Sequence, residues 1–197
     1  MTLYKAPSNK IIYDGEEYDF FPYWNRVLII SEEVIPSKSL SEEEKARIIV
    51  ESVSNAPFKL GVYETILHEL FPKRKRTNKK PDFSFSQDAD LIYSGFLQTY
   101  GINLYDEINK MDWRIFLALL RGLPESTEFS RIIKLRKQPI PKASKYNQQY
   151  INLLIEAKMS VALKEPEEDA KRRLADAWRN VARGLISRCQ TAKSNTK

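Results

Sequence analysis

The chain of 197 residues holds one histidine and one cysteine, His68 and Cys189, which limits the chemistry that its side chains could perform. His68-Glu69 begins like the HExxH helix of zinc proteases, but Pro72 stands where the second histidine would be needed. A zinc site requires about three or four converging His, Cys or carboxylate ligands. A serine or cysteine nucleophile would have His68 as its only imidazole base. We therefore expect no metal, no cofactor and no enzyme activity.

Two other features, an aspartate pair and the glycines, give no convincing ligand site. Asp88 and Asp90 could hold a cation, but both fall in the first turn of a helix predicted to begin at Ser86. There the helix dipole stabilises negative charge by about 0.3 to 1 kcal/mol. The six glycines form neither the GxGxxG nor the GxxxxGK loop that binds phosphates. The lack of catalytic, metal-binding and phosphate-binding motifs favours a protein that recognises another surface over an enzyme.

A dense basic run, KRKRTNKK, lies between Pro72 and Pro81. It has no apolar or aromatic side chain, so we expect an exposed basic connector over residues 73–85. The alternative is a nucleic-acid-binding protein, because basic side chains that neutralise phosphates release counterions. Because the run has no aromatic residues to stack on bases, we favour a solvated connector over a nucleic-acid-binding segment. Nucleic acid is therefore not the expected partner. The basic side chains of the run are Lys73, Arg74, Lys75, Arg76, Lys79 and Lys80.

The formal net charge of +6 is distributed unevenly along the chain. Residues 1–72 carry 7 basic and 12 acidic side chains, whereas residues 81–197 carry 19 basic and 14 acidic side chains. Opposite net charges on the two parts permit head-to-tail self-association, which would be weak and sensitive to salt.

The spacing of apolar, capping and turn residues predicts a mainly α fold, a helical bundle of about seven to eight helices with a small N-terminal β-hairpin. Asp14-Gly15 separates two short apolar runs within residues 10–21, as is typical of a hairpin. Ser39 and Ser41 each precede a glutamate by three positions and give two overlapping capping boxes for one helix. The expected helices cover residues 22–36, 39–57, 58–71, 86–100, 113–121, 126–137 and 143–163, with a last one after residue 166.

Capping and helix-breaking residues also mark the central helices. Gly101 favours a left-handed end to the helix that begins at Ser86, and Asp112 can cap the next one. Pro139 and Pro141 must end the helix before them. We therefore divide the chain into a hairpin with helices (1–72), the basic connector (73–85), a central helical core (86–138), C-terminal amphipathic helices (142–189) and a disordered tail (190–197).

Two apolar stripes near the C-terminus are the candidate partner-binding surface. One belongs to the helix expected over residues 143–163, in which Tyr146 begins the stripe, and the other follows Pro166. The two helices could fold back as a hairpin and complete the core, or they could hold a partner helix. The candidate partner-binding residues are Tyr150, Leu153, Leu154, Ala157, Val161, Leu174, Trp178, Val181 and Leu185.

The location expected from the sequence is a reducing cytoplasm. The first residues lack the charged and apolar regions of a secretory signal, and one cysteine cannot form an intramolecular disulfide. The longest uninterrupted apolar run, at residues 115–120, is far shorter than the roughly 20 residues of a transmembrane helix. We therefore expect no membrane partner.

A specific pattern occupies residues 82–133: a phenylalanine-rich lead-in, then QDA, IY, YGI-x-L, a tryptophan-centred helix and GLP. It is carried by Phe83, Phe85, Gln87, Asp88, Ala89, Ile92, Tyr93, Phe96, Tyr100, Gly101, Ile102, Leu104, Trp113, Phe116, Leu119, Gly122, Leu123 and Pro124. This pattern resembles the bacteriophage gene-product-fifteen family, found in tailed phages and prophages of Gram-positive bacteria. The stretches IIYDGEEYDF and SLSEEEKARI are similar to the hairpin and second helix of that family, so the likeness covers about residues 10–165.

The resemblance implies a role in building the phage tail in the host bacterial cytoplasm. Proteins of this family are thought to be assembly chaperones, absent from the finished virion, that coat the tape measure protein while the tail tube forms around it. The expected partner is thus the phage tape measure protein, with the tail tube protein as a second candidate. A structural tail completion protein is the alternative role within the phage.

Overall fold

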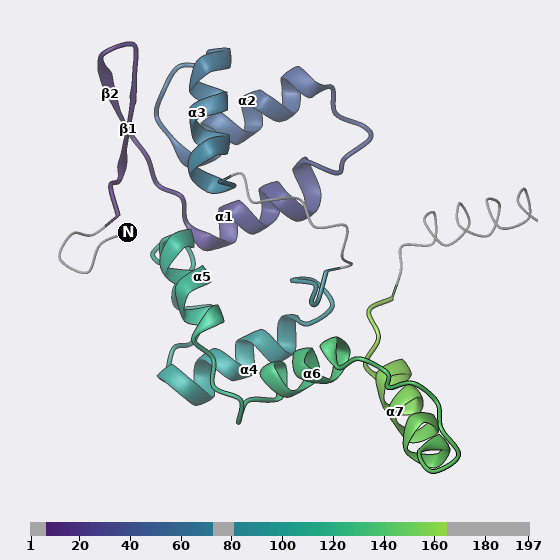
Figure 1. The fold of residues 1–197 in the computed structure, drawn as a ribbon. Helices are drawn as coiled ribbons and strands as arrows, with labels where there is room; N and C mark the ends of the chain where they lie inside the picture. The colour runs from purple at the N-terminus through teal and green to yellow at the C-terminus, as the bar shows by residue number, and fades with distance from the viewer. Residues whose placement is uncertain (1–6, 73–80, 165–197) are drawn as a thin grey trace, which may run out of the picture. The chain divides into compact units, whose positions relative to one another are not determined.

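The computed structural model describes residues 7–72 and 81–164. The chain divides into two units, Met1–Val161 and Ala162–Lys197, and only residues 162–164 of the second unit are described. The described part of the first unit contains one β-hairpin and seven α-helices, which confirms the mainly helical fold with a hairpin (Figure 1). The elements are β1 (Lys10–Tyr13), β2 (Glu16–Asp19), α1 (Trp24–Ile29), α2 (Glu42–Val53), α3 (Leu60–Leu70), α4 (Ala89–Tyr100), α5 (Trp113–Arg121), α6 (Glu128–Lys137) and α7 (Gln148–Ser160), with a π-helical turn η1 (Ile30–Val34) continuing α1.

The hairpin follows from the Asp14-Gly15 turn. Both residues adopt positive φ angles, 54° and 78°, which a tight two-residue connection requires and which glycine and aspartate tolerate. The strands pair antiparallel, with Lys10 opposite Asp19. Gly61 near the start of α3 lets the Tyr13 ring approach the helix, because a Cβ at Gly61 would collide with that ring. The hairpin therefore packs against α3.

Helix α2 begins with one of the two predicted capping boxes. The Ser41 hydroxyl accepts a hydrogen bond from the Glu44 amide, and the Glu44 carboxylate accepts one from the Ser41 amide at 2.8 Å. These hydrogen bonds, first from the Ser41 amide and then from its hydroxyl, hold the pKa of Glu44 below its usual value. Ser39 instead lies 3.0 Å from the Ser37 hydroxyl, so the structure selects the second box.

We predict that Ser41→Ala lowers the free energy of unfolding by about 1 kcal/mol, because the first turn of α2 loses its side-chain acceptor. Ser39→Ala is the matched control and should have little effect, since its hydroxyl caps no helix. Chemical denaturation followed by circular dichroism measures both. Equal losses for the two variants would contradict the assignment of the cap.

An aromatic cluster joins the helices on either side of residues 73–80. The Phe116 ring stacks on Trp24 of α1, Phe96 of α4 and Trp113 of its own helix, with centroid distances of 5.2, 5.1 and 5.6 Å. Phe85, in the lead-in to α4, lies 6.3 Å from the same ring. Such pairs add roughly 0.5 to 1.5 kcal/mol each beyond the burial of their area. Phe96, Trp113 and Phe116 of the 82–133 pattern thus belong to the buried core, and Phe85 packs against it.

Backbone and indole hydrogen bonds tie the same two segments together. The amide of Trp113 donates to the carbonyl of Pro22 at 2.7 Å, and the amide of Trp24 donates to the carbonyl of Met111 at 3.0 Å. The indole of Trp24 donates to the Glu107 carbonyl at 3.1 Å, and that of Trp113 donates to the Leu70 carbonyl at 3.4 Å. Trp24, which precedes residues 73–80, thus bonds to the segment after them, and Trp113, which follows them, bonds to the segment before them.

Several predicted helix bounds are wrong, and α2, for example, ends at Val53 and not at residue 57. Helix α4 begins at Ala89, not at Ser86, because residues 84–88 form a separate turn whose Asp88 amide bonds to the Ser84 carbonyl. Helix α7 covers Gln148–Ser160 and not residues 143–163, and Tyr146 lies in the turn before it. The other signals hold: Asp112 accepts a hydrogen bond from the Arg114 amide at the start of α5, and Gly101 ends α4 with a φ of 68°.

No helix among the described residues is both long and apolar enough to span a bilayer.

Candidate functional site

The catalytic candidates are not brought together in the described part of the chain. His68 lies on α3 beside Ile35, Leu67 and Phe71, and Cys189 lies outside the described residues. Among residues 7–72 and 81–164, no group of three or more His, Cys, Asp or Glu side chains could hold a metal ion. The electropositive run at 73–80 also lies outside the described residues.

Asp88 stands at the N-cap of α4 and not in the first turn of a helix begun at Ser86, and it forms a buried ion pair with Arg136. Its side chain is 3% exposed, and the carboxylate accepts two hydrogen bonds from the Arg136 guanidinium, at 2.7 and 2.8 Å. The Ser84 amide donates a third at 3.0 Å. Burial alone would raise the pKa of Asp88, but the bonds from Arg136 and Ser84 together with the Arg136 charge outweigh burial and hold this pKa below its usual value.

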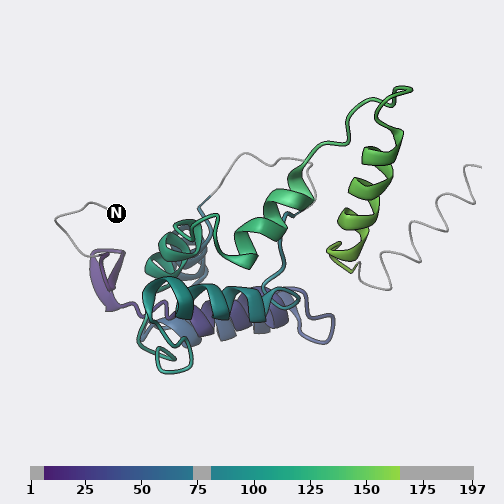
Figure 2. The same ribbon diagram turned by 90° about the horizontal axis from the view of Figure 1, so that it is seen from below.

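Polar contacts then connect α6 to the end of α7. The Arg136 Nε donates to the Val161 carbonyl at 2.6 Å. Lys158 of α7 donates from Nζ to the carbonyls of Leu135, Arg136 and Gln138, at 2.9, 2.6 and 2.7 Å. These carbonyls belong to the end of α6, where a positive charge is favoured by the helix dipole. Arg136 and Lys158 thus hold α7 against α6, and Figure 2 shows these two helices turned from the first view.

The predicted partner-binding residues of α7 divide between a buried and an exposed side. Leu154 is buried together with Ile151, so it anchors the helix. Tyr150 and Leu153 are 51% and 59% exposed, and Tyr146, one turn earlier, is 95% exposed. Tyr150 and Leu153 lie three positions apart on α7 and share one side of it, whereas Tyr146 stands in the turn before the helix. We call these three side chains the α7 stripe.

The remaining predicted residues add little to this surface or lie elsewhere. Ala157 and Val161 are half-buried. Leu174, Trp178, Val181 and Leu185 lie outside the described residues. Within the described part, the candidate binding surface is therefore centred on the α7 stripe.

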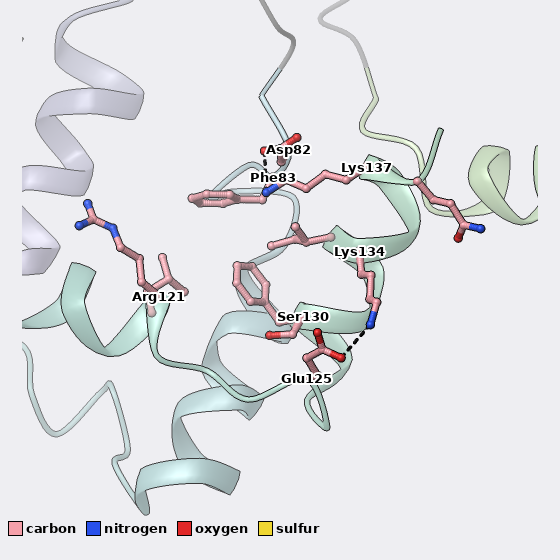
Figure 3. Close-up of a pocket in the computed structure, with 11 residues that line it drawn as sticks. Asp82, Phe83, Arg121, Glu125, Ser130, Lys134 and Lys137 are labelled. Carbon is pink, nitrogen blue, oxygen red and sulfur yellow. Dashed lines mark hydrogen bonds and ion pairs between the residues drawn. The ribbon is translucent and has the colours of Figure 1, made fainter. Parts of the chain in front are cut away.

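A groove that the sequence did not indicate lies between α6, the end of α5 and the lead-in to α4 (Figure 3). Its volume is about 770 Å³, and we call it the α6 groove. Phe83, Leu120, Phe129 and Ile133 form its apolar floor, and the Phe83 ring meets Phe129 edge-on with a centroid distance of 5.7 Å. Its floor residues come from three separate segments, so no single periodic pattern could reveal them.

Charged side chains form the rim of the α6 groove. Lys134 pairs with Glu125 at 2.7 Å and Lys137 pairs with Asp82 at 3.0 Å, and all four side chains are largely exposed. The hydrogen bond from Lys134, followed by its charge, lowers the pKa of Glu125. Figure 3 shows Arg121 across the groove from both lysines, and no ion pair joins it to another described residue. The rim thus carries three cations and two carboxylates.

The fold and these surfaces define a mainly helical protein whose described exterior presents an apolar helix side and an apolar groove with a charged rim. The family model described as Bacteriophage Gp15 protein matches residues 8–163. The chain belongs to this family, which confirms the relationship inferred from residues 82–133. Searches of curated proteins and of solved structures found no match.

Proposed function

We propose that this protein is a phage tail assembly chaperone that binds the tape measure protein in the host cytoplasm during assembly of the tail tube. Membership of the Bacteriophage Gp15 protein family supports a phage-related role. The observation that carries the finer proposal is the α7 stripe, in which large apolar side chains stay exposed on a helix that is otherwise docked. An apolar helix side of this kind suits binding to another helix.

The strength expected of such a contact fits a reversible chaperone. Full burial of one large apolar side chain contributes about 1.5 to 3 kcal/mol, so the stripe alone gives modest affinity. A long helical partner offers many sites, and linked sites raise the total affinity without any new kind of contact. The complex can therefore form along a filament and still dissociate site by site.

Coexpression with the tape measure protein of the same phage tests the proposal. We expect the soluble fraction of the tape measure protein to rise several-fold and the two proteins to copurify, because the chaperone covers apolar helix surface. An unchanged soluble fraction would contradict the proposal. Mass spectrometry of mature particles separates it from a tail completion role, since a chaperone should be absent from the virion.

A further inference from the structure

We propose that the α6 groove is a second contact site for the partner and that it takes an apolar helical segment flanked by carboxylates. This inference rests on the proposed function, because it names the chemistry of the segment that the chaperone binds. It goes further in assigning a separate site and a charge preference, neither of which follows from the α7 stripe.

The floor of the groove sets the first requirement for the occupant. Phe129 and Leu120 are buried, whereas Phe83 and Ile133 are half-buried and still face the groove. The available 770 Å³ accommodates several apolar side chains, which would remove the remaining exposed area of these residues from water. The occupant therefore presents apolar side chains to the groove.

The rim sets the second requirement. Arg121 brings a cation without an ion-pair partner among the described residues, and the two pairs of Lys134 and Lys137 are exposed. Exposed pairs contribute only about 0 to 1 kcal/mol, so a carboxylate from a partner can share or replace their acceptors at small cost. Of the other two basic residues of α6, Arg136 pairs with the buried Asp88 and Arg131 does not line the groove, so the positive charge of the rim comes from Arg121, Lys134 and Lys137. The surface complements a segment with acidic side chains beside its apolar ones.

The position of the polar groups argues for a polypeptide and against a small molecule. Small-molecule sites combine an apolar pocket with a few polar groups that converge inside it. In the α6 groove the charged groups Lys134, Glu125 and Lys137 are exposed at the rim, while the floor is apolar. An apolar centre with a polar, solvent-accessible rim is the arrangement of a protein interface.

The groove is also continuous with the α7 stripe. Gln138 lines the groove, and its side-chain amide donates a hydrogen bond to the Tyr150 hydroxyl at 2.9 Å. One partner segment, or two neighbouring segments of one partner, can therefore contact both surfaces. This continuity favours the partner of the α7 stripe as the occupant.

Model helical peptides test the charge preference directly. The probes are labelled amphipathic peptides of about 20 residues, roughly 30 Å when helical, with one leucine stripe flanked by glutamate in one peptide and by lysine in the other. Fluorescence anisotropy with the full chain should give at least about ten-fold tighter binding of the glutamate peptide. The double variant Arg121→Glu/Lys134→Glu should lose that preference. Binding of neither peptide, or no preference between them, would overturn the proposal.

Arg131→Glu/Lys110→Glu is the matched control. It makes the same change of charge at two exposed residues, one of them on α6, and neither lines the groove. It should change the affinity for the glutamate peptide less than about two-fold, with only long-range charge acting. An effect equal to that of the rim variant would overturn the assignment to the groove. Loss of self-association in the rim variant alone, with peptide affinity unchanged, would assign the groove to a second copy and also overturn the proposal.

Coexpression keeps this test separate from that of the proposed function. If the wild-type chain solubilises the tape measure protein and the rim variant does so equally well, the groove proposal fails and the chaperone proposal stands. If the wild-type chain has no effect on the tape measure protein, the chaperone proposal fails, whatever the peptides show.

Discussion

The double variant Tyr150→Asp/Leu153→Asp should weaken binding of the tape measure protein at least about ten-fold, because two half-exposed side chains, each worth about 1.5 to 3 kcal/mol on full burial, are replaced by charges. Both positions are more than half exposed, so the free energy of unfolding should change by less than about 0.5 kcal/mol for each. Copurification after coexpression measures the first effect, and chemical denaturation measures the second.

The control for this variant introduces the same charges on the same helix. Gln148 and Asn152 are exposed and polar, and their side chains bond to each other at 3.1 Å. Gln148→Asp/Asn152→Asp should retain most of the binding, since no apolar contact is lost. Wild-type binding by the stripe variant, or an equal loss in the control, would contradict the role of the α7 stripe.

Asp88→Ala should lower the free energy of unfolding by about 3 to 5 kcal/mol, the usual cost of removing one partner from a buried ion pair. The Arg136 side chain is only 14% exposed, so its guanidinium would be left with two backbone carbonyls, those of Asp82 and Val161. Glu125→Ala breaks the exposed pair with Lys134 on the same helix and should leave the unfolding midpoint nearly unchanged. Urea denaturation of both variants separates the two cases.

The pH dependence provides a second readout of the same pair. The pKa of Asp88 is lower in the folded state than in the unfolded state, where it is about 3.9. The stabilisation is therefore complete above that value and is lost as the pH falls below it toward the folded-state pKa. The difference between wild type and Asp88→Ala should be constant from pH 6 to about pH 5 and should shrink below about pH 4. A difference that stays the same at low pH would contradict an ionic origin.

The parts of the fold that the sequence predicted are those with local causes. Asp14-Gly15 has the φ angles that its turn needs, Ser41 and Glu44 bond to each other within one turn, and Asp112 caps α5. Each of these signals depends on residues at most three positions apart. The apolar spacing that produced the helices and their buried residues is likewise local, as at Val62, Ile66 and Leu70 of α3.

The parts that could not be predicted depend on contacts between distant segments. Asp88 is predicted to lie in the first turn of a helix because no residue near it in the sequence indicates its ion pair. Its partner, Arg136, lies 48 positions later. The floor of the α6 groove combines residues of the lead-in, α5 and α6. For α7, the apolar spacing places Leu153 and Leu154 in one predicted stripe. In the structure Leu154 is buried and Leu153 is exposed, and this difference depends on which side of α7 contacts α6.

The reciprocal bonds of the two tryptophans have a consequence for cooperativity. The Trp24 indole donates to the carbonyl of Glu107, which follows residues 73–80, and the Trp113 indole donates to the carbonyl of Leu70, which precedes them. Both rings also stack on Phe116. Neither half can melt without exposing the indole of the other. Backbone continuity through residues 73–80 is therefore not what joins them, and a chain cleaved there should persist as a two-fragment complementation complex.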